Sequence, residues 1–566
     1  MTTFGMLCPD TVSFDDFGRE GKPKLPEEQA IQGAHLAVNS LLRAFLRYAG
    51  ADRYWIFAPP FSVEQTAQGF RQEFGHSRLS ARVRVGSFFD LVQDFSDYKF
   101  THWMDFRCNF EAPSSLRRRL SNRLFPILVT HHALSYHCLL RILFIPMLLS
   151  ESFPFDSVVC TSTAAQKALA RLLDYLSREL RSELGLKAKF RGRLDLIPLG
   201  VDTDHFRPRP KLAARRQLHL PQDALILLYC GRLSPVDKAD LIPFFRVFRS
   251  LVESNPEKKL LLIVAGTPAG PHVDALSRCV RSLGLGRKMR FLIRPENTAL
   301  LFSAADIFIS PADSIQESFG MTVLEAMACG TPQVVSNWNG YRDTVADGET
   351  GYLVPTRWMP CDGDLCDAAP VCEGLCEGED TFDHLCLAQS VAVDLRAYRD
   401  RLQHLIESDD LRAAMSYHSR QRAIQCFSWP VVMRRYRSLW QELGTLAASS
   451  VRSPRSLASS DRPRYHDVFG HFASHTVDAS TRLRITTEGK RPGSAFAGRD
   501  PIAQEWGLFD PRLLREALRL LRKGDLTRED LADQLVSSSG SKPRHRHFIY
   551  RQIMSLLKYG LIEACD

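Results

Sequence analysis

The chain has 566 residues, of which 45% are hydrophobic and 24% are charged, and its formal net charge at neutral pH is +9. This length is enough for two large domains and a smaller unit, and the composition excludes a disordered or fibrous protein. Fourteen cysteines scattered over such a length do not form a disulfide framework, so we expect a cytosolic protein with reduced thiols.

The N-terminal region shows no targeting signal. Its first five residues are not a basic stretch that leads into an apolar core, so we expect no secretory leader. The most apolar run, from Cys138 to Ser150, contains Arg141 and Pro146 and is too short to span a bilayer. We therefore expect a cytoplasmic protein without a transmembrane segment. Its basic stretches leave a peripheral contact with the inner face of a membrane open.

Residues 1–190 are expected to form a first α/β domain. Apolar and β-branched runs predict three strands, at 54–57, 127–130 and 157–160. Helical spacing of apolar residues over 29–48 predicts a long helix. The polar residues that follow the second of these strands, starting with His131 and His132, are expected to face a cleft.

Residues 191–446 are expected to form a second α/β domain. Each of its strands is followed by Gly, Pro or polar residues and then by a helical pattern, which is typical of a doubly wound parallel sheet. The predicted strands are 225–230, 260–265, 289–293, 305–310 and 333–336. Two closing helices, at 395–426 and 430–447, are expected to pack back over the first domain.

An acidic insert at 357–387 interrupts this second domain. It contains five cysteines: Cys361, Cys366, Cys372, Cys376 and Cys386. Their spacing lacks the Cys-x2-Cys pairs that are typical of tetrahedral zinc, and the nearby His384 changes this little. We expect a solvated acidic loop over the rim of the cleft and no metal site.

The C-terminal part of the chain differs from the rest. Residues 447–464 are rich in Ser, Arg and Pro and predict a linker. Residues 465–566 predict a small, mainly helical unit shaped like a winged helix, with helices at 511–521, 526–535 and 547–558. The basic run 542–547 offers contacts to DNA phosphates, but no base-reading residues can be identified. We therefore expect a protein partner or the acceptor to dock here, rather than DNA.

The most informative segment is 317–332, ESFGMTVLEAMACGTP. Two carboxylates, Glu317 and Glu325, lie eight positions apart and bracket a glycine that opens an apolar helix. Ligands of parallel sheets bind beyond the carboxyl ends of the strands, and free amides at a helix N-terminus attract phosphate. These amides belong to Phe319, Gly320 and Met321. A nucleoside diphosphate sugar, with hydroxyl groups on both sides of its phosphates, fits this arrangement.

A second group of polar residues follows the first strand of this domain. In the segment 230–238, CGRLSPVDK, Arg232 and Lys238 flank a turn at the carboxyl end of that strand. Arginine supplies a planar set of donors and lysine a compact charge, so together they can neutralise a departing diphosphate. Gly266 ends the next strand, where a base or ribose can approach the backbone.

These motifs resemble the retaining glycosyltransferases of family 4, also called group 1 glycosyltransferases. Glu317 and Glu325, followed by Ala-Met-Ala-Cys-Gly-Thr-Pro, resemble the Glu-x7-Glu signature of that family. Gly-Arg-Leu and Lys238 resemble its donor-diphosphate motif. The resemblance covers about residues 120–440 and implies the GT-B fold, in which two Rossmann-like domains face each other across a cleft.

The resemblance also implies roles for single residues. Arg232 and Lys238 would hold the donor diphosphate, Glu317 the hydroxyls of the donor sugar, and Glu325 those of the ribose. His132 resembles a histidine close to the transferred sugar, and we expect it to act with Glu317, Arg232 and Lys238 in catalysis. Further donor contacts are expected from Gly33, Gly266, Phe319, Gly320, Met321 and Thr322.

We therefore expect a retaining glycosyltransferase that moves a sugar from a nucleoside diphosphate sugar to an acceptor. No metal or other cofactor is expected, because Arg232, Lys238 and the helix N-terminus can stabilise the diphosphate. The sequence does not identify the donor sugar, the base or the acceptor. Two alternatives stay open: a nucleotide-sugar-binding protein without turnover, and a regulator whose C-terminal unit binds DNA.

Overall fold

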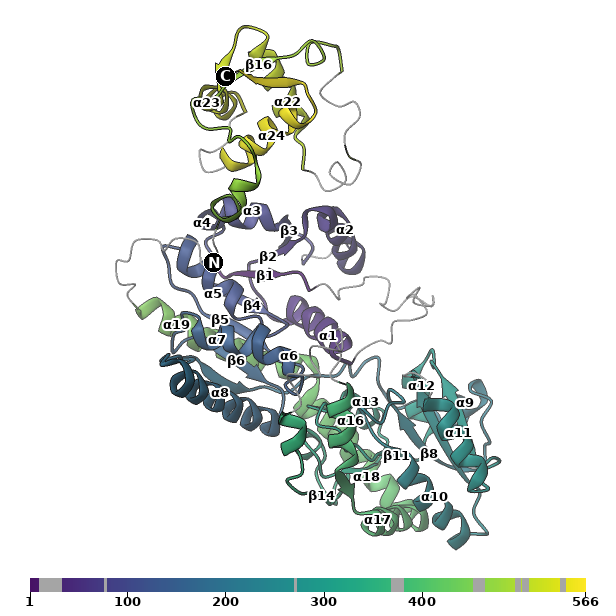
Figure 1. Ribbon diagram of the computed structural model, residues 1–566. Helices are drawn as coiled ribbons and strands as arrows, with labels where there is room; N and C mark the ends of the chain where they lie inside the picture. The colour runs from purple at the N-terminus through teal and green to yellow at the C-terminus, as the bar shows by residue number, and fades with distance from the viewer. Residues whose placement is uncertain are drawn as a thin grey trace. The chain divides into compact units, whose positions relative to one another are not determined.

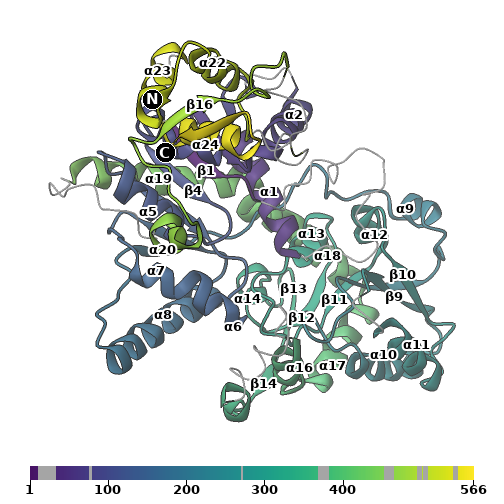
Figure 2. The ribbon, with the colours of Figure 1, turned by 45° about the horizontal axis from the view of Figure 1, so that its top comes forward.

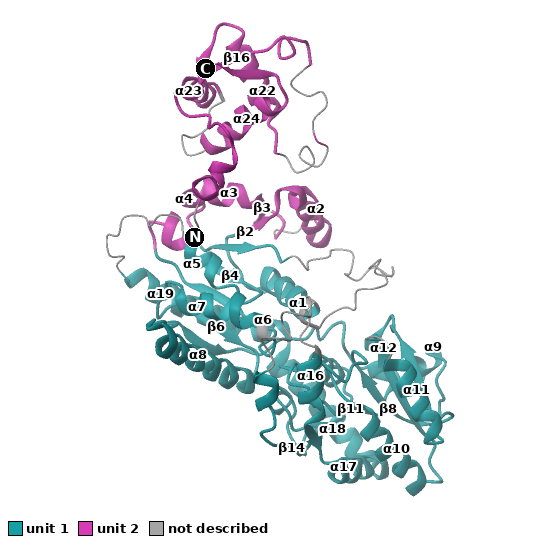
Figure 3. Ribbon diagram, in the orientation of Figure 1, with its two compact units in different colours: residues 1–54, 100–115, 124–451 teal, residues 55–99, 116–123, 452–566 magenta. Residues whose placement is uncertain are grey.

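Two large sheets form the framework of the protein (Figures 1 and 2). The chain divides into two compact units (Figure 3). Unit 1 consists of residues 1–54, 100–115 and 124–451, and unit 2 of residues 55–99, 116–123 and 452–566. The computed structural model describes residues 1–9, 33–75, 79–268, 272–367, 381–450, 464–493, 500, 508–539 and 546–565.

The first sheet has the strand order β3-β2-β1-β4-β5-β6-β7. Its strands are β1 (Thr3–Leu7), β2 (Arg53–Ala58), β3 (Val83–Ser87), β4 (His102–Asp105), β5 (Ile127–Thr130), β6 (Ser157–Cys160) and β7 (Arg193–Leu196). Strands β1, β4, β5, β6 and β7 pair in parallel. The predicted strands 127–130 and 157–160 are confirmed with the same bounds, and 54–57 lies within β2.

Helices connect the strands of the first sheet. They are α1 (Gly33–Tyr48), α2 (Val63–Phe74), α3 (Phe88–Gln93), α4 (Phe95–Tyr98), α5 (Glu111–Leu120), α6 (His137–Leu139), α7 (Ile145–Leu149) and α8 (Thr163–Leu184). Helix α1 confirms the predicted long helix from Gly33 onwards, and the first four residues of that prediction lie outside the described residues.

The second sheet has the order β10-β9-β8-β11-β12-β13, and all of its pairs are parallel. Its strands are β8 (Leu225–Cys230), β9 (Leu260–Gly266), β10 (Met289–Ile293), β11 (Ile307–Ser310), β12 (Gln333–Ser336) and β13 (Gly351–Val354). Its helices are α9 (Lys211–Gln217), α10 (Ile242–Ser254), α11 (His272–Ser282), α12 (Thr298–Ala304), α13 (Met321–Ala328) and α14 (Tyr341–Thr344). The predicted strands of this domain are confirmed to within two residues.

Side chains of β8 alternate between two apolar cores, as a strand with helices on both faces requires. Ile226 and Leu228 belong to the core that includes residues of α9, α12 and α13. Leu227 and Tyr229 belong to the core that includes residues of α10 and α17 (Leu395–Glu407). The two sheets therefore form two Rossmann-like doubly wound domains, which confirms the predicted GT-B fold class.

The insert leaves the second domain through a two-stranded antiparallel ribbon. Strand β14 (Thr356–Trp358) pairs with β15 (Val391–Val393), and helix α16 (Thr381–Gln389) lies between them in sequence. The chain thus departs and returns at one place. Residues 368–380, which include Cys372 and Cys376, lie outside the described residues.

The closing helices differ in part from the prediction. The predicted helix 395–426 is two helices, α17 and α18 (Asp409–Arg422), because the Ser408 hydroxyl accepts the N–H of Leu411 and caps a new helix. Helix α19 (Trp429–Ser449) reaches Ser449, inside the expected linker 447–464. It packs on the first domain, where the ring of Trp440 lies 5.1 Å from that of Phe45.

The described residues of the C-terminal part form four α-helices and a small antiparallel sheet of order β17-β16-β18. The elements are α20 (Tyr465–Phe469), β16 (Arg482–Ile485), α22 (Pro511–Leu521), β17 (Leu526–Thr527), α23 (Arg528–Ser539), α24 (Arg546–Lys558) and β18 (Ile562–Cys565). The predicted helix 526–535 was wrong at its start: Leu526 and Thr527 are in a strand. Thr527 and Asp530 form reciprocal hydrogen bonds that start α23 at the next residue.

The domain boundaries 190/191 and 446/447 stay predictions. Among the described residues, no helix is long and apolar enough to cross a membrane.

Candidate active site

The candidate site lies where the strand order of the second sheet reverses. Strands β8 and β11 are neighbours there, and the chain moves outward from them in opposite directions. Loops that follow such neighbouring strands diverge to opposite faces of the sheet and leave room for a ligand at their carboxyl ends. The loop after β8 carries Arg232 and Lys238, and the loop after β11 carries Glu317.

Two ion pairs form at this edge. The Nζ of Lys238 lies 2.9 Å from Oε2 of Glu317, whose side chain is 8% exposed. Nη1 of Arg232 lies 2.6 Å from Oδ2 of Asp237, and the Nε of Arg232 is buried without a hydrogen-bond partner. The structure thus brings Lys238 and Glu317 together as predicted. An incoming diphosphate would compete with the two carboxylates for the cations.

The pKa shifts of two buried side chains of β8 show which charged groups lie near the carboxyl end of this strand. The pKa of Tyr229 is raised, first by burial and then by nearby acids that include Glu317, while Arg232 opposes the shift. The pKa of Cys230 is raised, first by burial and then by Glu325. Arg232, Glu317 and Glu325 therefore all act electrostatically on the last two residues of one strand.

The start of α13 is held open by a glycine. Gly320 has φ 95°, and a Cβ at this position would overlap the ring of Tyr341, whose hydroxyl lies 2.8 Å from that of Ser310. Within the described residues the N–H groups of Met321 and Thr322 have no hydrogen-bond partner. They are therefore available to an anion at the N-terminus of the helix.

Phe319 and Glu325 lie on either side of this helix start. The N–H of Phe319 is 3.4 Å from Oε1 of Glu317, so this amide is directed at the carboxylate, and the ring is buried. Glu325 is partly accessible, and burial raises its pKa to about 8. Its carboxyl group makes no hydrogen bond or ion pair with other described residues. Its oxygens therefore have free hydrogen-bonding capacity within the described part of the chain.

The two predicted glycines are placed differently. At the end of β9, a Cβ on Gly266 would overlap the carbonyl oxygen of Gly231, so the backbones that end β8 and β9 approach closely. Gly33 is the first residue of α1, and residues 10–32 before it lie outside the described residues. Gly266 therefore lies beside Gly231, the residue before Arg232. For Gly33 the structure shows its position at the start of α1.

The side chains that follow β5 of the first sheet are neutral. Burial lowers the pKa of His132 to about 4, and burial followed by the neighbouring His132 lowers the pKa of His131 to about 3. Both imidazoles are therefore neutral near pH 7. Neither ring nitrogen of the fully buried His131 has a hydrogen-bond partner. The Nε2 of His132 lies 3.4 Å from the Thr130 hydroxyl.

Direct hydrogen bonds join this edge to the loop after β11. The Ser318 hydroxyl donates to the carbonyl of His132 at 3.3 Å, and the Ser162 hydroxyl donates to the carbonyl of Ser318 at 2.8 Å. The N–H of Thr163 donates to Oδ2 of Asp343 at 2.6 Å. The backbone of His132 is thereby held next to Ser318, the residue that follows Glu317.

Sequence reasoning missed several of these residues. Ser162 and Asp343 join the two domains, and a weak signal existed in the polar run Thr161–Thr163 at the end of β6. Asp313 was also missed. Burial raises its pKa to about 8, and both of its carboxylate oxygens accept the N–H of Asp240. An acid at the third position of the loop after β11 has no signature of its own.

The described part of the insert holds no cluster of metal ligands. Among the described residues no group of three or more His, Cys, Asp or Glu side chains is arranged to hold a metal ion. Cys361 and Cys366 are exposed, and Cys386 is half-buried on α16. In contrast to the expected solvated loop, His384 on the same helix is buried.

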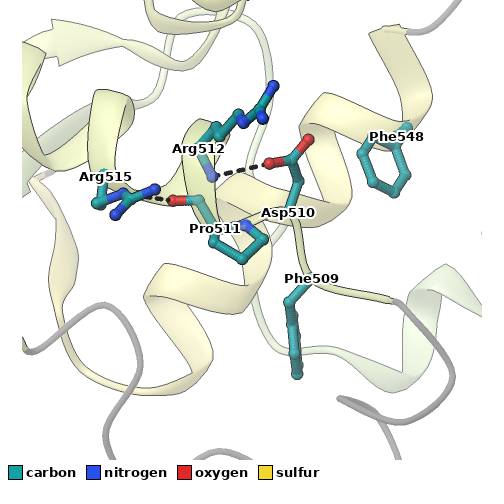
Figure 4. Close-up of a pocket in the computed structure, with 6 residues that line it drawn as sticks. All are labelled: Phe509, Asp510, Pro511, Arg512, Arg515 and Phe548. Atoms are coloured by element: carbon teal, nitrogen blue, oxygen red, sulfur yellow. Dashed lines mark hydrogen bonds between the residues drawn. The ribbon is translucent and has the colours of Figure 1, made fainter.

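A further hollow lies in the C-terminal unit, at the start of α22 (Figure 4). It is lined by Phe509, Asp510, Pro511, Arg512, Arg515 and Phe548. Asp510 accepts the N–H of Arg512 at 2.8 Å, and Nε of Arg515 donates to the carbonyl of Pro511 at 3.2 Å (Figure 4). These polar contacts serve the helix start itself.

The basic residues of this unit are partly neutralised. Arg546 at the start of α24 pairs with Glu529 and Asp533, and Arg528 pairs with Glu529 at 2.8 Å. Charges that are already paired contribute less to phosphate binding. The predicted role of residues 465–566 in docking a partner stays a prediction.

Comparison with known proteins places the second domain in a family. Residues 210–359 match the family model of the glycosyl transferases group 1. A D-inositol 3-phosphate glycosyltransferase of Catenulispora acidiphila is 38% identical over 194 residues, which are 33% of this chain and 44% of that protein. A protein of the same description from Stackebrandtia nassauensis is 36% identical over 226 residues, 37% of this chain and 49% of its own length.

The chain thus spans less than half the length of the curated relatives it matches. Among solved structures, HepE of Anabaena in complex with UDP and glucose is 16% identical, with a TM-score of 0.49 and coverage of 78% of this chain and 100% of that one.

Proposed function

We propose that this chain transfers a glycosyl group from a nucleoside diphosphate sugar to an acceptor hydroxyl, as the match of residues 210–359 to the model of the glycosyl transferases group 1 supports. The observation that carries the proposal is the contact between Lys238 and Glu317 at the carboxyl edge of β8 and β11. It joins the two motifs of the sequence in one place, beside a helix start with free amides.

In the proposed reaction the acceptor oxygen attacks the anomeric carbon of the donor. The bond from that carbon to the diphosphate oxygen breaks, and its electron pair leaves with the nucleoside diphosphate. Arg232, Lys238 and the amides of Met321 and Thr322 lie where they would stabilise the growing negative charge. The proton of the acceptor passes to an oxygen of the departing diphosphate, which needs no protein base.

The other predicted residues complete the site. Glu317 would bind hydroxyls of the donor sugar, Glu325 those of the ribose, and the neutral His132 would donate or accept a hydrogen bond near the transferred sugar. Attack from the face of the leaving group gives retention of configuration. This stereochemistry follows from the resemblance to family 4, and it remains part of the proposal together with the absence of a metal requirement.

A ligand screen tests the proposal. A ligand that binds only the native state raises the melting temperature, so UDP-glucose, GDP-mannose, ADP-glucose and dTDP-glucose are compared by thermal shift. We expect one base to be preferred and its donor to release nucleoside diphosphate in the presence of EDTA. D-inositol 3-phosphate serves as one acceptor probe, because the relatives carry that name, and proton NMR of the product reads the anomeric configuration. No shift with any of the four donors would contradict the proposal.

A further inference from the structure

Helix α16 of the acidic insert makes contacts with both Rossmann-like domains around the candidate site. Nε2 of His384 lies 3.3 Å from the carbonyl oxygen of Ser135, a residue 249 positions away in sequence, and the His384 ring lies 4.6 Å from that of Tyr136. His384 is 1% exposed. A carbonyl only accepts, so Nε2 carries the hydrogen, and Nδ1 is a buried atom without a partner.

The Ser135 loop continues the same chain of contacts to the donor side. The Ser135 hydroxyl donates to Oε1 of Gln316 at 3.0 Å, and Gln316 immediately precedes Glu317. His132 lies three residues before Ser135, and its carbonyl accepts the Ser318 hydroxyl. The loop that carries His132 is therefore held at one end by Ser318 and at the other by His384 and Gln316.

A second contact of α16 reaches the loop that carries Lys238. Nε2 of Gln389, at the end of α16, donates to Oδ2 of Asp240 at 3.1 Å. Asp240 lies two residues after Lys238, and its N–H is bonded to the buried Asp313. One short helix thus contacts the His132 loop directly and the Lys238 loop directly, and the Glu317 loop through Ser135.

We infer that α16 is a part of the reaction site and that His384 is a positioning residue, which fixes the His132 loop against the Glu317 loop so that donor and acceptor groups meet in one geometry. The inference rests on the proposed glycosyl transfer and extends it to a segment outside residues 210–359. His384 acts through Ser135 and does not touch the reacting atoms. Its loss misplaces groups that are needed in the transition state more than groups that bind the donor.

The test uses four versions of the full-length protein. His384→Ala removes the hydrogen bond and the ring contact, and His384→Gln keeps a side-chain N–H donor at a similar reach. Phe382→Ala is the matched control, because Phe382 lies on the same helix and is 60% exposed. Donor affinity is measured by titration with the nucleotide sugar that the thermal-shift screen selects, and turnover by release of its nucleoside diphosphate.

We expect His384→Ala to keep donor affinity within about twofold and to lower turnover about tenfold, the effect of one lost hydrogen bond at the geometry of a site. His384→Gln is expected to regain most of the turnover, and Phe382→Ala to match the unchanged protein. Equal losses of affinity and turnover in His384→Ala, or no loss of either, would overturn the inference.

Hydrogen exchange gives a readout that does not depend on activity. In His384→Ala, amides of the loops 131–136 and 313–317 are expected to exchange faster than in Phe382→Ala, while the strands of both sheets exchange alike. If the unchanged protein binds and turns over none of the four nucleotide sugars, the proposed function fails, and exchange in these two loops alone decides whether α16 positions them. Unchanged exchange in both loops would refute the positioning role.

Discussion

The six strands of the second sheet follow the same order as the first six strands of the first sheet, but the two sheets differ in charge at their carboxyl edges. The second sheet places two ion pairs there, Lys238 with Glu317 and Arg232 with Asp237. The first sheet places neutral groups there, because burial keeps the pKa of His132 at about 4. Two sheets of similar topology therefore carry different charges at their carboxyl edges.

The difference matches the chemistry of the two substrates in the proposed reaction. A diphosphate carries charge that grows when the glycosidic bond breaks, and fixed cations stabilise it. An acceptor hydroxyl carries no charge and needs only hydrogen bonds, which a neutral imidazole or a serine supplies. The comparison predicts that charge changes matter most on the second sheet.

The largest effect is expected from Lys238→Met. The change removes one of two cations that would meet the diphosphate, so we expect no thermal shift with the preferred donor and a fall in turnover of about 100-fold or more. Lys259→Met is the matched control, because Lys259, the residue before β9, is exposed and pairs with Asp223, which precedes β8. Donor titration and nucleoside diphosphate release are measured for both.

Since Lys238→Met also leaves Glu317 buried without its partner, folding must be followed separately. The double variant Lys238→Met/Glu317→Gln is expected to regain folding stability without regaining turnover. A single variant that folds and still shows the full donor shift would mean that the donor binds elsewhere.

The next prediction distinguishes the binding roles of Glu325 and Glu317. We expect Glu325→Ala to weaken binding of the preferred donor and of its nucleoside diphosphate alike, by about 2- to 10-fold, because the pKa of about 8 leaves the carboxyl group protonated near pH 7 and a neutral hydrogen bond contributes about 0.5–1.5 kcal/mol. Glu317→Gln is expected to weaken only the sugar-bearing donor. Calorimetric titration measures the affinity of both variants for the donor sugar and for its nucleoside diphosphate. The nucleotide base is the one that the thermal-shift screen selects. If Glu325→Ala and Glu317→Gln weakened binding of the nucleoside diphosphate equally, Glu325 would not be the residue that binds the ribose.

The sequence predicted the donor edge because its signals are local. Gly-Arg-Leu and Lys238 follow one strand, and Glu317 and Glu325 follow another. In a doubly wound sheet the loops after the two strands at which the strand order reverses lie close together, so these motifs could be expected to meet. The reciprocal contacts of Thr527 and Asp530 and the cap at Ser408 are local as well. Their Thr-x-x-Asp and Ser-Asp-Asp patterns would have corrected both helix starts.

The contacts between domains had no such signal. His384 meets Ser135, and Ser162 meets Ser318, across 249 and 156 positions of the sequence. Serine and histidine occur in many settings, and only the packed arrangement of both sheets decides which of them meet. The insert was therefore predicted as a solvated loop, although His384 is buried and contacts Ser135 and Tyr136 of the first domain.

A smaller effect tests how the anion-binding helix start is built. Gly320→Ala combines a positive φ of 95° with overlap of the buried Tyr341 ring, and we expect a loss of about 2–4 kcal/mol of stability. Gly348→Ala has φ 77° but open space around its Cβ, so about 1 kcal/mol is expected. Urea denaturation compares them. Equal losses of stability in the two variants would show that the Tyr341 ring moves away from the new Cβ without a measurable cost in free energy.

The smallest effect is a difference in pH dependence between the two edges. Glu325 has a folded-state pKa of about 8 against an ordinary value of 4.5, so between these pH values the native state keeps a proton that the unfolded chain has lost. Its contribution therefore makes the protein less stable as pH rises from about 4.5 to 8. His132, with a pKa of about 4 against 6.5, stays neutral while the unfolded chain gains a proton, so its contribution falls as pH drops from 6.5 to 4.

Glu325→Gln is thus expected to remove a fall of the unfolding free energy as pH rises from about 4.5 to 8, and His132→Asn to remove a rise between about 4 and 6.5, so the two changes shift the slope in opposite directions. One proton bound in only one of the two states changes the slope by at most about 1.4 kcal/mol per pH unit. Glu325 is partly accessible, so its share is smaller because water screens it. Urea denaturation at half-unit steps of pH measures both slopes. If Glu325→Gln changed the slope below pH 6.5 in the sense expected of His132, the two edges would not carry separate charge states, and the division between a charged donor edge and a neutral acceptor edge would not hold.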